Sequence, residues 1–289
     1  MTSADRTATA APRMLLSGLV MGESPRWHGD LLWVSDMGAR QVIAVDLEGG
    51  SEVIARVPNG LAGIGFLPDG RLLVVAAGDG RLLRLEPDGS IVTHADLNDV
   101  FRPYWNDLVV DGRGNAYVSN VGFDFPAGEF APGIVAMVDA DGRARQVAEG
   151  LAFPNGLAVT PDNSTLIVAE SYGSRLTAFD IAADGSLSDG RVWADLPGGH
   201  PDGICVDADN AVWFGDVPAM QCVRVREGGE ILQTIDLQGG CFACALGGAA
   251  RKTLFLVVAE WPLPQMTGTD RRSGQVLTVE APVPGAGWP

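Results

Sequence analysis

Short apolar runs that follow turn-forming residues recur along the whole chain. Each run has about five residues rich in valine, leucine and aromatic side chains, and most follow a turn such as PDG, DGRG or PDN. This pattern predicts β-strands that leave hairpin turns. The runs lie at 30–36, 70–76, 114–120, 164–170, 210–216 and 252–258, so successive starts are 40, 44, 50, 46 and 42 residues apart. Six repeats are therefore expected.

Each repeat contains further candidate strands around the marker run. A second apolar run precedes most of the turns, as in NDLVV, NGLAV and DGICV, and two more strand-like segments follow. Four short strands in 40 to 50 residues are typical of a β-propeller blade. The 38 glycines and 18 prolines interrupt nearly every window that could form an amphipathic helix. The prediction is an all-β chain that forms a six-bladed β-propeller.

The domain boundaries follow from the same pattern. Residues 1–13 are small and polar and are expected to be a disordered leader, and 14–289 are expected to form a single propeller domain. The run MLLSGLV at 14–20 is predicted to pair with the strand GQVLTVE of the last blade. Such pairing closes the ring and leaves neither end as an exposed edge.

Charge and composition limit the partners. The chain has 36 acidic and 20 basic residues, and its net charge of −16 would repel nucleic acid and anionic membrane surfaces. The first dozen residues lack the apolar core of a secretory signal or a membrane span. We expect a cytoplasmic protein that acts on a small molecule, with no nucleic-acid or membrane partner.

All four cysteines lie in the last third of the chain, at 205, 222, 241 and 244. Cys241 and Cys244 have CxxC spacing, but no second pair completes a zinc site and no βαβ setting suggests a redox motif. Buried, inert thiols are expected.

The repeats also locate a candidate site. The innermost strand of each blade lines the central channel, so polar residues at equivalent positions of these strands converge on the axis. Counting back seven to nine residues from each marker run gives Glu23, Gly63, Asn106, Asn155, Asp202 and Cys244. Taken singly, an Asn-Gly or Asp-Gly pair is ordinary turn chemistry. The shared register is what favours a functional site.

Two carboxylates and two amides around one axis are hard ligands for a divalent cation. Glu23, Asn106, Asn155 and Asp202 are therefore the predicted metal ligands, and without a cation the two carboxylates would repel each other. Ca²⁺ is favoured, with Mg²⁺, Mn²⁺ and Zn²⁺ as alternatives. Such a cation can polarise a carbonyl or phosphoryl oxygen and activate water, which indicates hydrolysis of a lactone, ester or phosphoester.

The segments GESPRW, YWNDLVVDGRGNAYVSN, FPNGLAVTPDNSTLIVAES and HPDGICVDADNAVWFGD resemble, in this order and spacing, the gluconolactonase and regucalcin family, also called the senescence marker protein family. The resemblance covers nearly the whole chain from about residue 14 and implies a six-bladed propeller with lactonase or related esterase activity. It implies that Glu23, Asn155 and Asp202 are metal ligands and that Asn106 lies beside the metal. It also implies that Asp202 is the general base.

The sequence departs from this family at a position that concerns substrate. Members that hydrolyse sugar lactones often have an arginine two residues before the asparagine of the ND pair, where this chain has Tyr104. The segment 119–133 is rich in aromatic residues, Gly and Pro and could cover the channel mouth. Tyr104, Trp105 and Phe123 are expected to form a partly apolar substrate pocket. The alternative is that these aromatic residues pack between blades.

Two more side chains are candidates for proton transfer. His200 precedes Asp202 by two residues, and we interpret it as a substrate-binding or base residue, or else as a loop cap outside the channel. Glu170 is interpreted as a solvated turn carboxylate rather than a site residue.

Other functions are compatible with the same residues. A phosphotriester or fluorophosphate hydrolase could use an equivalent metal site, and a calcium-binding regulatory protein would need no turnover. Metal-free condensing enzymes resembling strictosidine synthase share the propeller shape, although two channel carboxylates and two amides are not required there.

Overall fold

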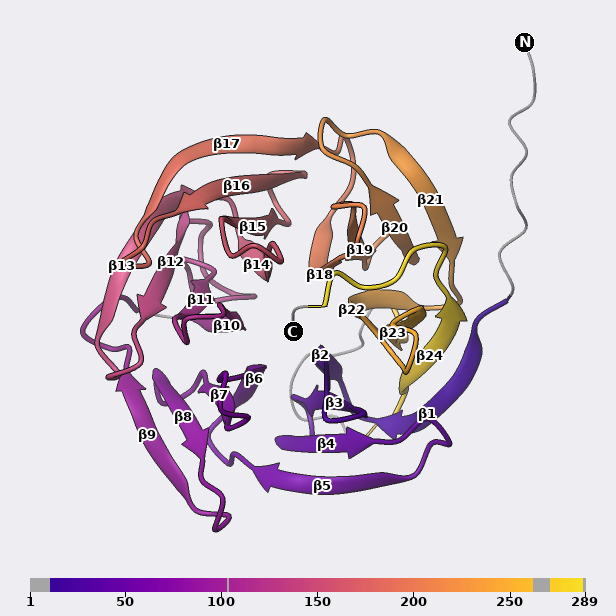
Figure 1. Cartoon of the computed structure of the whole chain (residues 1–289), viewed down its shortest axis with the longest axis horizontal. Helices are drawn as coiled ribbons and strands as arrows, with labels where there is room; N and C mark the ends of the chain where they lie inside the picture. The colour runs from indigo at the N-terminus through magenta and orange to yellow at the C-terminus, as the bar shows by residue number, and fades with distance from the viewer. Residues whose placement is uncertain (1–10, 103, 262–270, 288–289) are drawn as a thin grey trace.

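The structure is a computed structural model that describes residues 11–102, 104–261 and 271–287. In these ranges, strands form six four-stranded antiparallel sheets and no helix is present. The sheets stand around a common centre like the blades of a propeller (Figure 1). No segment of the described ranges is a helix that could cross a membrane.

The blades follow one another along the chain. The first is β2 (Gly22–His28), β3 (Leu31–Asp36), β4 (Gln41–Val45) and β5 (Ser51–Arg56), and the second is β6 (Leu61–Phe66), β7 (Leu72–Ala76), β8 (Arg81–Leu85) and β9 (Ile91–Asp96). The third is β10 (Trp105–Val110), β11 (Ala116–Asn120), β12 (Gly133–Val138) and β13 (Ala144–Leu151), and the fourth is β14 (Pro154–Val159), β15 (Thr165–Glu170), β16 (Arg175–Ile181) and β17 (Leu187–Asp195). The fifth is β18 (Pro201–Val206), β19 (Val212–Asp216), β20 (Gln221–Val225) and β21 (Ile231–Asp236).

The sixth blade joins the two ends of the chain. It contains β22 (Gly240–Gly247), β23 (Thr253–Ala259) and β24 (Gly274–Glu280), and its outermost strand is β1 (Arg13–Leu19). Met14 lies opposite Leu277 in this antiparallel pair, so the predicted ring closure is confirmed. The predicted leader, 1–13, lies largely outside the described residues.

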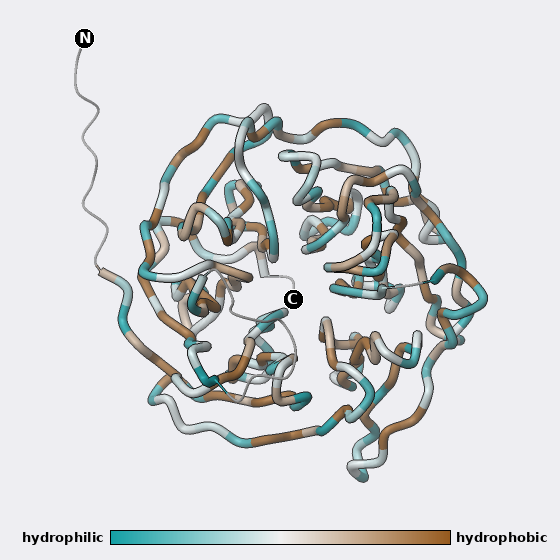
Figure 2. The backbone as a smooth tube through the Cα atoms, turned by 180° about the vertical axis from the view of Figure 1, so that it is seen from behind, coloured by the Kyte–Doolittle hydropathy of each residue, from teal (hydrophilic) through white to brown (hydrophobic). Residues whose placement is uncertain are grey.

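Burial explains why the marker runs are apolar throughout. They correspond to β3, β7, β11, β15, β19 and β23, the second strand of every blade, and these strands pack against neighbouring blades on both faces. The outermost strands β5 and β9 are mostly exposed. Figure 2 shows hydrophobic stretches in strands all around the ring. Sheets buried on both faces need continuous apolar runs, whereas an edge strand tolerates polar residues.

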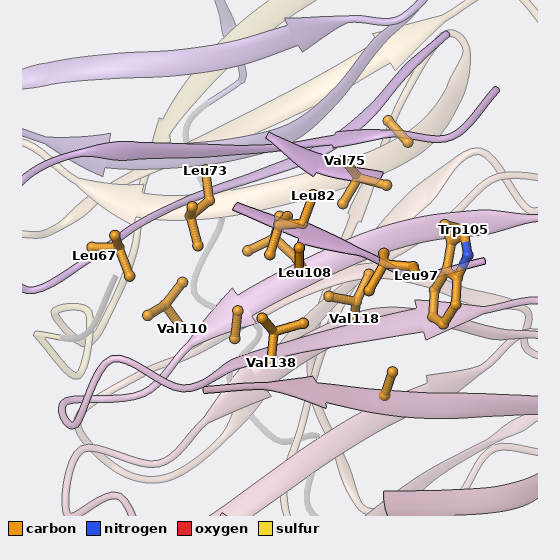
Figure 3. Packing of buried hydrophobic residues seen from close by; sticks show 14 of the residues in the cluster. Leu67, Leu73, Val75, Leu82, Leu97, Trp105, Leu108, Val110, Val118 and Val138 are labelled. Atoms are coloured by element: carbon orange, nitrogen blue, oxygen red, sulfur yellow. The ribbon is translucent and has the colours of Figure 1, made fainter. Parts of the chain in front are cut away.

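The core lies between adjacent blades rather than at the centre. Between the second and third blades, Leu82, Leu97, Trp105, Leu108 and Val118 belong to one buried cluster (Figure 3). This packing leaves the innermost strands β2, β6, β10, β14, β18 and β22 around the axis (Figure 1). The end of the channel where these strands begin is called the mouth below.

Candidate metal centre

The four predicted ligands enter the channel at the mouth. Glu23, Asn106, Asn155 and Asp202 are each the second residue of an innermost strand. The register of all four strands shifts at or directly after this residue, as between Pro201 and Ile204 in β18. Such β-bulges re-aim side chains and are common beside functional sites.

Asn155 and Asp202 are each followed by a glycine that does not form the expected turn. Gly156 and Gly203 lie inside β14 and β18, without the positive φ that the turn glycines have. A Cβ on Gly156 would lie 2.5 Å from the Asp202 backbone oxygen, and one on Gly203 would lie 2.4 Å from the Ala243 Cβ. The turn interpretation of PNG and PDG is therefore wrong, because these glycines let adjacent innermost strands approach closely.

The second blade departs from the predicted register by one residue. In β6, Leu61 pairs with Ala76 and Ile64 pairs with Val74, which repeats the pairing pattern of β18. The position equivalent to Asp202 is therefore Ala62, not Gly63. Ala62 supplies no side-chain donor.

The sixth blade departs by two residues. Because Gly203 faces Ala243, the residue equivalent to Asp202 in β22 is Phe242, not Cys244. Phe242 is buried and packs with Val217 and Ala259. The donors of the candidate metal centre thus come from the first, third, fourth and fifth blades.

A chain of hydrogen bonds connects these blades. The Asn106 Nδ2 donates to the Asn155 Oδ1 at 2.7 Å, and the Asn155 Nδ2 donates to the Ser171 Oγ at 3.2 Å. The Ser171 hydroxyl donates in turn to the Pro201 backbone oxygen at 2.7 Å, directly before Asp202. These contacts fix both the oxygen and the nitrogen of the Asn155 amide, with the oxygen directed toward Asn106.

Negative charge accumulates at the mouth. Burial raises the pKa of Glu23 well above its ordinary value, and the carboxylates of Asp202 and Asp107 raise it further. Burial and the Asp107 carboxylate also raise the pKa of Asp202, and the Asn155 side chain partly offsets this. Carboxylates that are costly to ionise in this way become stable anions when a cation binds between them.

Asp107 is anchored next to the site by a buried ion pair. Its Oδ1 lies 3.0 Å from the Arg26 Nη2 and accepts a 2.8 Å hydrogen bond from the Ser24 hydroxyl. Arg26 also donates to the Leu108 backbone oxygen at 2.6 Å. The Arg26 guanidinium pairs with Asp107, so Glu23 and Asp202 have no ion pair of their own within the described residues, and a divalent cation would favour their ionised forms.

The donor set fits such a cation. The Asp202 Oδ1 is buried and has no hydrogen-bond partner in the described part of the chain, an expensive arrangement that a ligand relieves. Within the described ranges no three His, Cys, Asp or Glu side chains are grouped as metal ligands. The candidate centre instead combines two carboxylates with the amide oxygen of Asn155, beside the side chain of Asn106, and such hard oxygen donors suit Ca²⁺ or Mg²⁺.

A small cavity lies among the later residues of the innermost strands, beyond the candidate centre. Arg26, Val109, Val159, Cys205 and other side chains enclose a cavity of about 20 Å³, enough for about one water molecule. At that end the C-terminal segment runs back toward the centre (Figure 1), where the Ala286 amide donates to the Val206 oxygen. A substrate would therefore enter from the mouth.

The predicted substrate-binding residues divide into two groups. Tyr104 is half-buried and packs against the buried cluster of Val121, Phe123 and Phe153 at the mouth. Trp105 is 2% exposed and belongs to the core between two blades. A substrate cannot reach Trp105, so for this residue the inter-blade alternative is correct.

The two proton-transfer candidates also differ in environment. His200 is exposed at the mouth, and its backbone amide donates to the Asp216 Oδ2 at 3.3 Å. Glu170 is fully buried rather than solvated, because Arg175 and the Ala152 amide donate to its carboxylate. Burial opposes its ionisation, but these hydrogen bonds and one from Thr177 hold the pKa of Glu170 below its ordinary value.

Three of the four cysteines are buried, as expected, and Cys205 is partly buried. All four are free, and Cys222, Cys241 and Cys244 are buried. The Sγ atoms of Cys205 and Cys244 lie 3.8 Å apart, across the contact between β18 and β22. Burial raises the pKa of Cys222. Burial also opposes ionisation of Cys244, but hydrogen bonds with Cys205 and Cys222 lower its pKa to about 5.

Sequence reasoning missed Arg26, Asp107 and Ser171. The charged pair lies within the GESPR and ND segments already singled out, so its opposite charges on two predicted innermost strands were an available signal. Ser171 follows a strand of the fourth blade, and nothing in the spacing indicates its contact with Asn155.

Two known enzymes are similar to this chain in sequence. The chain is 25% identical over 288 residues to a 6-deoxy-6-sulfogluconolactonase of Pseudomonas putida, covering 93% of this chain and 94% of that protein. It is 29% identical over 204 residues to the diisopropyl-fluorophosphatase of Loligo vulgaris, covering 61% of this chain and 63% of that enzyme.

A solved structure and a family model are also similar to this chain. A gluconolactonase of Xanthomonas campestris superposes with a TM-score of 0.74 at 25% identity, covering 95% of each chain. The family model described as the SMP-30/gluconolactonase/LRE-like region matches residues 21–260. The predicted family is thereby confirmed, and the chain belongs to the SMP-30/gluconolactonase/LRE-like family.

Proposed function

We propose that this protein is a divalent-metal-dependent hydrolase that opens a lactone, or cleaves a related ester, by attack of activated water. The observation that carries the proposal is the convergence of Glu23, Asn106, Asn155 and Asp202 at the channel mouth, with one carboxylate oxygen of Asp202 left without a partner. The hydrolase names of the relatives support the reaction class.

Each side chain has a separate role in this proposal. Glu23, Asn155 and Asp202 hold the cation, and Asn106 orients the Asn155 oxygen and faces the bound substrate or water. A bound cation would polarise the substrate carbonyl and lower the pKa of the attacking water. Ca²⁺ is the favoured ion because every donor is a hard oxygen.

Asp202 is proposed as the general base. The Asp202 carboxylate accepts a proton from water while the water oxygen bonds to the carbonyl carbon. The bond between the carbonyl carbon and the ring oxygen then breaks, and the proton passes to the departing alkoxide. The product is the hydroxy acid, and Asp202 returns to its starting state.

The mouth favours a substrate less polar than a sugar lactone. Tyr104 occupies the place where an arginine could bind sugar hydroxyls, and it packs against the buried apolar cluster that contains Phe123. Neither side chain offers the several hydrogen bonds that a polyhydroxylated ring needs.

Turnover of aliphatic, aromatic and sugar lactones, with and without added Ca²⁺, tests the proposal. Hydrolysis that needs the cation and falls by about 100-fold or more in Asp202→Asn is expected. Asp236→Asn, an exposed carboxylate on β21, is the matched control and should retain full activity. Full cation-dependent activity in Asp202→Asn would reject the assignment of the base.

Fluorophosphate hydrolysis is the second candidate, favoured by the likeness to diisopropyl-fluorophosphatase. Adding diisopropyl fluorophosphate to the panel separates the two reactions. Tight Ca²⁺ binding with no turnover of any substrate would instead indicate a calcium-binding regulatory protein.

A further inference from the structure

Three further aromatic side chains gather around the predicted Phe123 at the channel mouth. Phe123 and Phe130 belong to the loop between β11 and β12, Phe153 directly precedes β14, and Tyr172 lies two residues after the end of β15. Pairing of Trp105 with Asn120 and of Pro154 with Glu170 places all of these segments at the end where the innermost strands begin. We call Phe123, Phe130, Phe153 and Tyr172 the aromatic shelf.

The four rings form one contact network. Tyr172 lies 4.7 Å from Phe153 and 6.0 Å from Phe130 between ring centroids, with interplanar angles of 33° and 34°. Phe123 contacts the other three rings, with centroids 5.8 Å from both Phe130 and Phe153 and 6.1 Å from Tyr172. The rings therefore hold one another in fixed orientations at the mouth.

Two rings of the shelf face solvent. Phe130 is 55% exposed and Tyr172 is 53% exposed, whereas Phe123 is 7% exposed. Two large exposed aromatic side chains in contact, supported by a buried third, form a rigid apolar surface rather than scattered exposed residues. Surfaces of this kind on soluble proteins are commonly binding sites.

The backbone of the shelf is strained. Phe153 has a φ of 60°, in the left-handed region that bulky residues rarely adopt. Its carbonyl accepts a hydrogen bond from the Ser171 amide at 3.1 Å, and the Ala152 carbonyl accepts one from the Tyr172 amide at 3.2 Å. Strain that the surrounding contacts maintain is concentrated at functional sites.

The same segment connects the shelf to the candidate metal centre. Ser171, the neighbour of Tyr172, accepts a hydrogen bond from Asn155 through its hydroxyl group. Phe153 lies two residues before Asn155 in the chain. A substrate whose carbonyl lies at the candidate centre thus has the shelf beside it.

From this juxtaposition we propose that the shelf binds an aromatic ring carried by the substrate, so that the preferred substrates are aryl-substituted lactones or esters. The inference rests on the hydrolase function proposed above. The exposed, tilted faces of Phe130 and Tyr172 allow a planar ring to stack or pack edge to face. A compact polar lactone has no ring to stack here, so it gains no binding energy from this surface.

Kinetics with a matched substrate pair test the shelf. The ratio of kcat/KM for a six-membered lactone fused to a benzene ring to kcat/KM for the unsubstituted lactone is measured first. Tyr172→Ala and Phe130→Ala should each lower this ratio by about tenfold, the effect of losing one aromatic contact. Tyr172→Phe keeps the ring and should preserve the ratio. Val192→Ala, which removes an equally exposed apolar side chain on β17, should also preserve it.

A binding measurement separates this inference from the proposed function. The lactams that correspond to the two lactones resist hydrolysis, and their dissociation constants are obtained by calorimetry in saturating Ca²⁺. Tighter binding of the aryl lactam, lost in Tyr172→Ala and retained in Tyr172→Phe, supports the shelf even if no lactone is turned over. Equal binding of both lactams, or a preference that Tyr172→Ala leaves intact in protein with an unchanged melting temperature, overturns it.

Discussion

Asn106 donates a 2.7 Å hydrogen bond from its side-chain amide to the side-chain oxygen of Asn155, 49 residues further along the chain. The bond joins the third and fourth blades at the channel mouth. Since the Asn155 Nδ2 donates to Ser171, the amide has one orientation, with its oxygen available to a cation. The orientation of a proposed ligand is thus set by residues that need not bind the metal.

Ser171→Ala is predicted to weaken Ca²⁺ binding by about 10- to 100-fold, because outer partners of metal ligands typically contribute this much. The substitution removes the acceptor that orients Asn155. Calorimetric titration with Ca²⁺ measures the effect. Ser35→Ala is the control, since the Ser35 hydroxyl is buried without a hydrogen-bond partner in the described structure. Unaltered Ca²⁺ affinity in Ser171→Ala would refute the orienting role.

Gly203→Ala is predicted to lower the free energy of unfolding by about 1–3 kcal/mol, the usual cost of overpacking. The new Cβ would lie 2.4 Å from the Ala243 Cβ and 2.7 Å from its Cα, which cannot move without shifting β22. Gly112→Ala is the control, because its Cβ would meet only the end of the Asn163 side chain. Denaturant unfolding gives the free energy of unfolding of both variants. Equal values for Gly203→Ala and Gly112→Ala would show that the blades do not approach this closely.

The fold was predictable because the repeat is strong. Second strands such as β7 and β11 are buried on both faces, so each appears as a continuous apolar run at nearly constant spacing. Ring closure followed from the need to pair β1. The sequence does not display the bulges in the innermost strands, and for that reason Gly63 and Cys244 were predicted, one and two residues away from the equivalent positions Ala62 and Phe242.

The candidate site was predictable in its donors and not in their surroundings. Glu23 and Asp202 stand out because carboxylates are unusual beside apolar strands. Trp105 looked like a substrate-binding residue because it adjoins Asn106, yet successive residues near the bulge point in different directions and the indole enters the core. Glu170 was misjudged because its partner Arg175 lies across a turn.

Glu170 predicts a specific dependence of stability on pH. Its pKa is lower in the folded protein than the ordinary 4.5, so its contribution is complete above pH 4.5 and is lost as the pH falls through the folded value. Glu170→Gln should lower the free energy of unfolding by about 2 kcal/mol at neutral pH. Below pH 4.5 the difference from the unmodified protein should shrink.

Unfolding measured by circular dichroism from about pH 3 to about pH 7 tests this prediction, because ordinary carboxyl pKa values lie within this interval. Glu52→Gln, at an exposed position on β5, serves as the control and should show no such difference. A constant gap between Glu170→Gln and the unmodified protein over the whole range would contradict the assignment.

The central claim is that hydrolysis depends on a cation held by Glu23, Asn155 and Asp202. It is tested most directly by the rate of lactone hydrolysis after the cation is removed with a chelator and dialysis, and again after Ca²⁺ is restored. The account predicts a loss of about 100-fold or more and recovery on adding Ca²⁺. Undiminished turnover by protein that elemental analysis shows to be free of metal would contradict it.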